Sequence, residues 1–289
     1  MSGRLILVAT PIGNLGDMAP RAVAALEEAD VILCEDTRRT RILLSALEIP
    51  ARGRLSALHA HNEDGRADGI IDRVATGAHV VLVSDAGMPG ISDPGQVLVA
   101  AAASAGLEVT VVPGPSATLG ALVVSGFATD RFCMEGFLPR KGRDRTATLN
   151  ALASEERTTI IFESPRRLGS TLGDLAATLG DDRRVVVVRE LTKVHEEVWR
   201  GTLLEAVAAW GAREVRGEVV LVVDGAEPPL EVAISDAEIT EQLEMSRQAG
   251  ASTRDAAAEV ATRLGVPRRR VYELATGPSP SSRGAGSHR

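Results

Sequence analysis

The chain has little cysteine and few aromatic residues. Its two cysteines, Cys34 and Cys133, lie far apart in apolar runs, which excludes a disulfide framework and argues against a zinc site. Aromatic residues make up only 2% of the sequence, too few for a platform of stacked rings that binds single-stranded RNA. Any bound nucleic acid must therefore be held by arginine side chains and phosphate contacts.

Long apolar runs are also missing. The longest, Val97 to Leu107, is shorter than the ~18 residues of a membrane span and already contains Ser104 and Gly106. The apolar stretch near the N-terminus ends at Thr10 and is too short for a signal peptide. With 44% hydrophobic and 25% charged residues the chain can bury a core, so we predict a globular cytoplasmic protein without a membrane partner.

Lysine is nearly absent. Of 32 basic residues only Lys141 and Lys193 are lysines, and the formal net charge is −7. That charge argues against unspecific attraction to polyanions but leaves room for local basic sites. Arginine cannot lose its proton, so a lysine kept among so many arginines is a candidate for chemistry of its own. Two chance survivors on the surface are the plain alternative.

Apolar runs alternate with helical stretches along the chain, which predicts an α/β fold. In the first half the runs are nearly continuous, as buried parallel strands require. The expected strands there are 4–9, 31–34, 55–58, 79–83 and 107–112, with helices at 20–29, 38–47, 63–76 and 94–105. The second half predicts strands at 132–135, 158–162, 184–189, 196–201 and 218–224, with helices at 145–154, 166–179 and 203–211. Its sheet should be mixed, because 184–189 and 196–201 are close enough to pair antiparallel.

The same pattern predicts the domain boundaries. We expect one α/β domain over residues 1–117 and a second over 118–225, since 289 residues suggest more than one domain. A linker at 225–230 precedes a helical domain at 231–276, which has helix-turn-helix character with a turn at Gly265. The last residues, 277–289, have no apolar side chain larger than alanine and are expected to be disordered.

Glycine, proline and small residues collect where the predicted strands end. Ligands bind outside the carboxyl ends of the strands in an open α/β sheet, so six such loops on one edge indicate a site. The glycines also let backbone approach a ligand closely. A dinucleotide fingerprint and a P-loop are both missing. The loops are TPIGNLGD (10–17), EDTR (35–38), SDAGMPGISDPG (84–95), PGPSA (113–117), ESPRR (163–167) and ELTK (190–193).

These loops, with HNE (61–63), GFLPRKGRDR (136–145) and GEVVLVV (217–223), resemble the ribosomal-RNA branch of the tetrapyrrole methylase superfamily. The resemblance runs from about Leu5 to Asp224, and its helical C-terminal part extends it to 235–276. It implies a two-domain α/β enzyme, usually a homodimer, that holds S-adenosylmethionine between its domains. The substrate it implies is a cytidine ribose 2′-hydroxyl in small-subunit (16S) ribosomal RNA.

Carried over to this sequence, the resemblance implies a set of cofactor contacts from both domains. They are Pro11, Asp85, Met88, Ser116 and Ala117 from the first domain, and Phe162 and Glu218 from the second. The basic clusters are candidates for RNA contacts, although any one of them is also an ordinary solvated face. They contribute Arg38, Arg140, Lys141, Arg143, Arg145 and Arg166.

The reaction itself suggests catalytic groups. Methyl transfer to a hydroxyl requires alignment and the removal of a proton from a weak acid. A lysine whose pKa is lowered by burial or a nearby cation is a plausible base or oxyanion stabiliser, and Lys193, with Glu190 to orient it, fits that role. Asp36, or its neighbour Glu35, is an alternative acid–base group, or simply a helix-start acid. No ligand set for a metal is present.

Two other functions remain open at this point. A methyltransferase of the same architecture that acts on a tetrapyrrole or another small molecule would need an apolar cleft, and the arginine-rich loops make an anionic polymer more natural. A DNA-binding regulator would use the helix expected at 267–275 with its three arginines, Arg268 to Arg270. Such a regulator does not require six specialised loops on one sheet edge.

Overall fold

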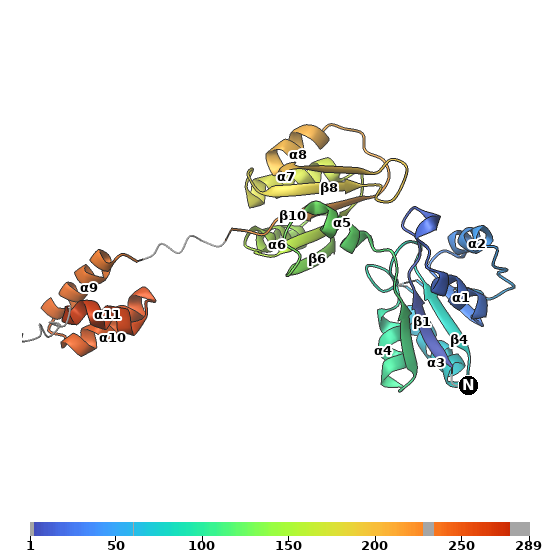
Figure 1. Ribbon diagram of the computed structural model, residues 1–289, viewed down its shortest axis with the longest axis horizontal. Coiled ribbons are helices and arrows are strands. Elements are labelled where there is room, and N and C mark those ends of the chain that lie inside the picture. Colours follow the sequence, from blue (N-terminus) through green and yellow to red (C-terminus); the bar gives the residue numbers. More distant parts are fainter. Residues whose placement is uncertain (1–2, 60, 228–233, 278–289) are drawn as a thin grey trace, which may run out of the picture. The chain divides into compact units, whose positions relative to one another are not determined.

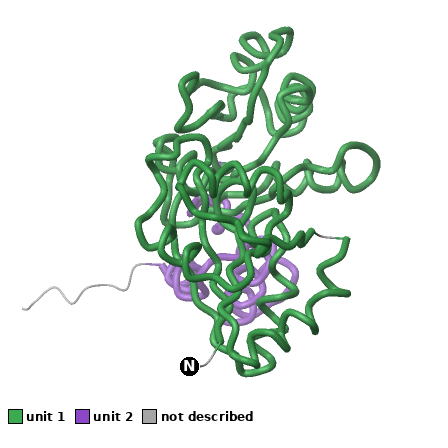
Figure 2. The backbone as a smooth tube through the Cα atoms, turned by 90° about the vertical axis from the view of Figure 1, so that its right-hand side faces the viewer, with its two compact units in different colours: residues 1–226 green, residues 227–289 purple. Residues whose placement is uncertain are grey.

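The computed structural model describes residues 3–59, 61–227 and 234–277. The chain forms two compact units, residues 1–226 and residues 227–289, which Figure 2 shows in green and purple. Both predicted α/β domains fall within the first unit, and the boundary at residue 117 stays a prediction. Residues 278–289 of the expected tail and 228–230 of the expected linker lie outside the described residues.

The first sheet is entirely parallel, as the continuous apolar runs predict. Its strand order is β3-β2-β4-β1-β5. Figure 1 labels two neighbouring strands of this sheet, β1 and β4. Its strands are β1 (Arg4–Val8), β2 (Val31–Cys34), β3 (Leu55–Ala57), β4 (His79–Val83) and β5 (Glu108–Val112). The centre of this sheet is buried on both faces, so strand ends rather than strand faces meet solvent.

Alternate residues of these strands face two different helical layers. Ile6 and Val8 pack with the layer of α1 (Pro20–Glu28) and α2 (Thr37–Ala46). Leu5 packs on the opposite face with α3 (Glu63–Ala75) and α4 (Gln96–Ser104). The four helices lie within two residues of the predicted boundaries, because each begins and ends at a turn that the sequence marks.

The second sheet is mixed and has the order β6-β7-β10-β8-β9. β9 runs antiparallel to β8, as predicted, and β10 runs antiparallel to both of its neighbours. The strands are β6 (Phe132–Phe137), β7 (Thr158–Glu163), β8 (Arg184–Arg189), β9 (Glu197–Thr202) and β10 (Val219–Val223). One face packs against α6 (Arg143–Ala153), α7 (Leu168–Leu179) and α8 (Leu203–Trp210), around the buried ring of Trp210.

The other face of the second sheet is covered by a helix that the sequence analysis missed. This helix, α5 (Ala117–Ser125), lies in a segment taken as a domain boundary, and its Ala121 and Leu122 pack under β7, β8 and β10. Its sequence is apolar on all sides and therefore gives no helical periodicity. Ser116 caps the helix by accepting a hydrogen bond from the Leu119 amide (3.3 Å), and Gly126 ends it with a φ of 79°.

The C-terminal unit contains three short helices, in the region where the sequence predicts a helical domain. They are α9 (Asp236–Gln248), α10 (Thr253–Leu264) and α11 (Arg268–Thr276), packed around a core that includes Ile239, Val260 and Val271. Gly265 makes the turn between α10 and α11 with a φ of 66°. Within the described part of the chain no helix is both long and apolar enough to cross a membrane.

Candidate active site

The ends of the two sheets in the first unit enclose a cleft of about 470 Å³. This volume is within the range of small-molecule and cofactor sites. The first sheet contributes the ends of β1, β2, β4 and β5, and the second contributes the ends of β6 and β7 and the start of β10. The residues that line the cleft include Ile12, Glu35, Arg39, Ser84, Asp85, Gly87, Met88, Asp93, Ser116, Ala117, Phe137, Phe162, Glu163 and Glu218.

The long loop after β4 is fastened at both ends. Gly87, with a φ of 81°, exchanges two backbone hydrogen bonds with Thr10 in the loop after β1 (2.9 and 3.0 Å). The hydroxyl of Ser84 donates to the carboxylate of Asp93, which closes the loop upon itself. The loop therefore presents its backbone and its Met88 side chain to the cleft in a fixed conformation.

The far end of this loop is held by an acidic residue from the HNE motif. Glu63 is 6% exposed, and its Oε1 accepts hydrogen bonds from the amides of Gly95 (3.0 Å) and Leu98 (2.9 Å). These amides belong to the first turn of α4, which has no side-chain cap of its own. Glu63 is thus a helix cap supplied by a neighbouring helix.

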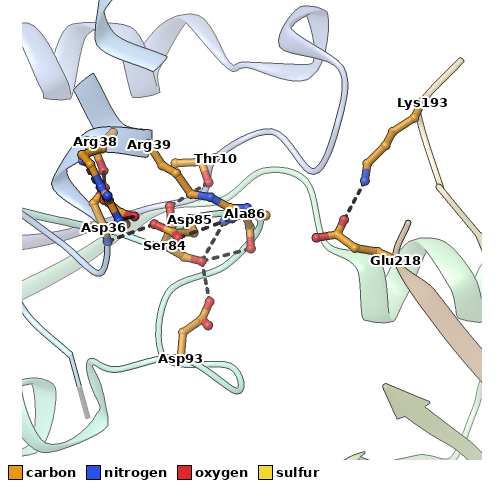
Figure 3. Close-up of polar contacts among 11 residues, drawn as sticks. Thr10, Asp36, Arg38, Arg39, Ser84, Asp85, Ala86, Asp93, Lys193 and Glu218 are labelled. Atoms are coloured by element: carbon orange, nitrogen blue, oxygen red, sulfur yellow. Dashed lines mark hydrogen bonds and ion pairs between the residues drawn. The ribbon is translucent and has the colours of Figure 1, made fainter. Parts of the chain in front are cut away.

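Three carboxylates gather on the first-sheet side of the cleft. Burial raises the pKa of Glu35, and the charges of Asp93 and Asp85 raise it further. Burial also raises the pKa of Asp93, partly offset by the hydrogen bond from Ser84. Arg39 is the nearby cation, 3.4 Å from Asp85 (Figure 3). Burial is the main cause of both raised pKa values, and a cationic ligand beside Glu35 and Asp93 would favour their ionised forms.

A second charged group lies on the second-sheet side. The Lys193 ammonium is 2.7 Å from Glu190 Oε1 and 2.8 Å from Glu218 Oε2, and Glu218 lines the cleft (Figure 3). The backbone is strained here, because Glu190 and Thr192 have φ values of 52° and 68°. Non-glycine residues in this region are uncommon and cluster at functional sites.

Two glycines leave room for the side chains of Lys193 and its partner Glu190. A Cβ atom on Gly13, in the loop after β1, would lie 2.3 Å from Lys193 Cγ, and one on Gly217 would lie 2.3 Å from the carboxyl carbon of Glu190. The lysine side chain therefore lies against the backbone of the opposite sheet's loop. Only glycine leaves that space, so Gly13 and Gly217 fix where Lys193 and Glu190 can lie.

The lowered pKa expected for Lys193 is wrong. Burial does work to lower the pKa of the ammonium, but the hydrogen bonds and charges of Glu190 and Glu218 outweigh it and the net shift is upward. The same contact with Lys193 lowers the pKa of Glu190. Lys193 is therefore a cation at neutral pH, suited to stabilising negative charge rather than to accepting a proton.

The structure separates the two neighbouring acids after β2. Glu35 lines the cleft, whereas Asp36 caps α2 and pairs with the Arg38 guanidinium at 3.0 Å. Hydrogen bonds from Arg38 lower the pKa of Asp36. The alternative role of a helix-start acid thus describes Asp36, and Glu35 is the acid that faces the cleft. Pro11 does not line the cleft; its neighbour Ile12 does.

The other expected cofactor residues line the cleft together. Asp85, Met88, Ser116 and Ala117 do so from the first sheet and α5, and Phe162 and Glu218 do so from the second. Phe162 packs on Phe137 at 5.6 Å between ring centroids. Sequence reasoning missed Phe137, Arg39, Asp93 and Glu163 as lining residues; for Asp93 its place in the glycine-rich loop was a usable signal.

The basic residues divide into free and engaged side chains. Arg140, Lys141, Arg143 and Arg166 are exposed and make no ion pair with any residue in the described ranges. Arg145, also expected to contact RNA, is buried, and its guanidinium bonds within the protein. That expectation needs correction: Arg145 lies in the first turn of α6 and bonds to Asp174 on α7.

The alternative of a DNA-binding regulator loses support. In the C-terminal unit, Arg269 pairs with Glu273 (2.9 Å) and Arg270 with Asp236 (2.6 Å). Two of the three arginines of α11 are thus neutralised within the unit, which weakens the case for a DNA-reading helix.

Comparisons with known proteins agree with this fold. The chain is 49% identical to ribosomal RNA small subunit methyltransferase I of Mycobacterium tuberculosis over 273 residues, 94% of each chain. It is 46% identical to the protein of the same name from Synechocystis sp. over 272 residues, 94% of this chain and 97% of that one.

Solved structures show the same fold at lower identity. Diphthine synthase superposes with a TM-score of 0.60 at 16% identity, covering 76% of this chain and 89% of its own. Uroporphyrin-III C-methyltransferase from Thermus thermophilus, complexed with S-adenyl homocysteine, has a TM-score of 0.55 at 22% identity over 77% and 97% of the two chains. The tetrapyrrole (corrin/porphyrin) methylases as a family match residues 4–207. The chain therefore belongs to the tetrapyrrole (corrin/porphyrin) methylase family, as its motifs predict.

Proposed function

We propose that this protein transfers a methyl group from S-adenosylmethionine to the ribose 2′-hydroxyl of a cytidine in small-subunit (16S) ribosomal RNA. The observation that carries the proposal is one cleft with carboxylates on one wall and, on the other, Glu218 bound to the Lys193 ammonium, in a chain 46% and 49% identical to two ribosomal RNA small subunit methyltransferases I. The choice of cytidine and of the 2′-hydroxyl rests on the sequence motifs.

The residues of the cleft fit the cofactor. A sulfonium and an α-ammonium are both cations, and Glu35, Asp85 and Asp93 supply the negative charge that such a ligand needs. The apolar side chains Met88 and Phe162 offer a surface for a purine ring. The backbone of Ser116 and Ala117, at the start of α5, adds amide donors at the positive end of a helix.

When bound, S-adenosylmethionine supplies an electrophilic methyl group, whose bond to sulfur breaks as its bond to the ribose oxygen forms. Lys193 and its neighbours provide the rest of the proposed chemistry. The Lys193 ammonium stabilises the negative charge that develops on the 2′-oxygen as the hydroxyl proton passes to a solvent water. Glu190 orients the ammonium. Glu218, whose side chain is 65% exposed, also binds the ammonium and itself lines the cleft.

The RNA side of the proposal rests on charge. The chain has a net charge of −7, yet Arg140, Lys141, Arg143 and Arg166 are exposed cations with no ion pair to a described residue. The first three lie where the chain enters α6, and Arg166 lies in the loop between β7 and α7. Such side chains bind phosphates and fix the register of an RNA. We place the protein in the cytoplasm with its ribosomal substrate, and we propose that it acts as a homodimer.

Mapping modified nucleosides in ribosomal RNA tests the proposal. Cells that lack the protein should lose one 2′-O-methylcytidine from their small-subunit RNA, and the unmodified gene should restore it. A Lys193→Met gene should not restore it. A methylated small molecule in the extract, with ribosomal RNA unchanged, would favour the rival tetrapyrrole-type methyltransferase and overturn the choice of substrate.

A further inference from the structure

Two arginines from the basic motifs point into the protein instead of toward solvent. The side chain of Arg145, in the first turn of α6, is 10% exposed, and that of Arg167, directly before α7, is 25% exposed. Both motifs also contain exposed arginines with no ion pair to a described residue. The two kinds of arginine therefore have different tasks.

Arg145 uses its guanidinium to join two helices and a loop. Its Nε and Nη2 atoms donate to Asp174 Oδ2 on α7 (2.9 and 2.7 Å), and Nη2 also donates to Thr171 Oγ1 (3.1 Å). Its Nη1 atom donates to the backbone carbonyl of Pro139 (2.9 Å). The planar fork of arginine makes such a multiple contact rigid.

Arg167 binds the backbone of Leu138, the residue before Pro139, in the same way. Its Nη2 atom donates to the carbonyl of Leu138 (3.0 Å) and lies 3.3 Å from Glu163 Oε2. Thr171 donates to that same carboxylate oxygen (2.6 Å), so the two arginines belong to one network. Two successive carbonyls, those of Leu138 and Pro139, are thus fixed directly before Arg140.

The segment that follows depends on this anchor. Arg140, Lys141 and Arg143 are exposed, and Gly142 between them has a φ of 85°. α6 begins directly after Gly142 without a side-chain cap. Nothing in the segment itself holds its shape, so its geometry is set by the carbonyls at its base and by α6.

We propose that Arg145 and Arg167 are positioning residues, which hold residues 140–143 in the conformation that binds the RNA backbone without touching the RNA themselves. The inference rests on the proposed function and deepens it, because it states how the RNA site is built. A segment that is already ordered loses less conformational entropy on binding than one that must be ordered by the RNA. Loss of the anchor should therefore weaken RNA binding although no contact to RNA is removed.

One substitution changes RNA affinity in opposite directions under the positioning role and under a purely electrostatic role. Asp174→Asn removes a negative charge near the basic segment, so a purely electrostatic account predicts tighter RNA binding. Loosening of Arg145 predicts weaker binding instead. The Asp174 side chain is 48% exposed, and an amide there leaves no buried charge behind. Asp224→Asn is the matched control, because Asp224 pairs with Arg184 at the opposite edge of the second sheet.

The experiment measures filter binding of small ribosomal subunits that lack the modification, at several salt concentrations, with calorimetry of S-adenosylhomocysteine binding on the same proteins. We expect Arg145→Met to weaken subunit binding about tenfold and Asp174→Asn about threefold, or about 1.4 and 0.6 kcal/mol. The salt dependence and the cofactor affinity should stay unchanged, and Asp224→Asn should behave as the unmodified protein.

The outcomes distinguish this inference from the proposed function. Tighter or unchanged binding by Asp174→Asn overturns the positioning role, as does a salt slope that falls by about 1 in Arg145→Met, the mark of a lost phosphate contact. Failure of the unmodified protein to bind subunits, with cofactor binding intact, instead contradicts the choice of substrate and removes the inference with it.

Discussion

The two walls of the cleft are built on sheets of different topology, and this difference determines which residues reach the site. The first sheet is parallel, so the loops after its strands leave at one edge. They bring glycine-rich backbone and the carboxylates Glu35, Asp85 and Asp93. The second sheet is mixed, so its cleft edge combines strand ends with one strand start. That start carries Glu218, the partner of Lys193.

The comparison shows how each wall contributes to the function. The first wall is acidic and rigid, which suits a cationic cofactor. The second wall carries Glu218, which binds the Lys193 ammonium, and that ammonium suits the developing oxyanion. The exposed arginines of the same domain lie outside the cleft lining and suit the RNA. Gly13 is where the walls meet, because the loop after β1 leaves room for the lysine side chain. Substitutions on either wall should therefore affect different kinetic constants.

The largest effect is expected from Lys193→Met. Removal of one charged group at a developing oxyanion lowers kcat by roughly 10²- to 10³-fold. Cofactor binding by calorimetry and subunit binding by filter assay should remain, because neither wall loses the residues that hold those partners. Lys193→Arg keeps the charge in a different shape and serves as the control. Full turnover by the methionine variant with RNA bound would contradict the role of Lys193.

Gly13→Ala tests the contact between the walls. The new Cβ atom would lie 2.3 Å from Lys193 Cγ, which forces the lysine away from Glu190 and Glu218. Because the change adds only a methyl group on the opposite wall, we expect kcat to fall roughly tenfold while the Kd for S-adenosylmethionine stays near its original value. Gly16→Ala in the same loop is the control, since the nearest atom to its Cβ, Asn14 Oδ1, is 3.2 Å away. Equal kcat values for the two variants would refute the contact.

The acidic wall predicts a pH dependence of cofactor binding. A cationic cofactor prefers ionised carboxylates, and burial together with repulsion raises the pKa of Glu35, while burial raises that of Asp93. Affinity should therefore be complete above these raised pKa values and fall as the pH falls through them, starting at a higher pH than for ordinary carboxyls.

Glu35→Gln makes this dependence testable. Loss of one charge facing the cofactor should weaken binding about tenfold near neutral pH, and it should flatten the acid limb of the affinity profile. Calorimetry with S-adenosylhomocysteine and with S-adenosylmethionine separates the part due to the sulfonium charge. Glu28→Gln, at the exposed end of α1, is the matched control. An unchanged profile in Glu35→Gln would show that this carboxylate does not face the cation.

The two walls also differ in how well the sequence predicts them. Runs such as Val80 to Val83 predict buried parallel strands, and ligand loops follow at their carboxyl ends. The rule that ligand loops follow the carboxyl ends of strands does not find Glu218 on the second wall, because Glu218 lies before β10. The direction of β10, antiparallel to its neighbours, is set by the packing of the whole sheet and cannot be seen in the local sequence. The helix α5 was missed because its apolar surface has no period.

Individual side chains were harder to place than loops. Adjacent acids such as Glu35 and Asp36 are equivalent in sequence, and only the start of α2 decides which one caps the helix. Likewise, nothing local distinguishes the buried Arg145 from the exposed Arg143, because the distinction comes from Asp174 on another helix. The lowered pKa assigned to Lys193 failed because the contacts with Glu190 and with Glu218 together outweigh burial, and Glu218 comes from a distant part of the chain.

The smallest effect is expected from Lys141→Ala. Lys141 is exposed and makes no ion pair with a described residue, so its loss should neither destabilise the fold nor alter cofactor binding. If it contacts one phosphate, subunit binding weakens about equally for all RNA sequences and the salt slope falls by about 1. This change in slope distinguishes a residue that touches RNA from Arg145, for which the slope should not change. Lysine at this position therefore acts as a simple charge, in contrast to Lys193, and Lys141→Arg should restore both affinity and slope.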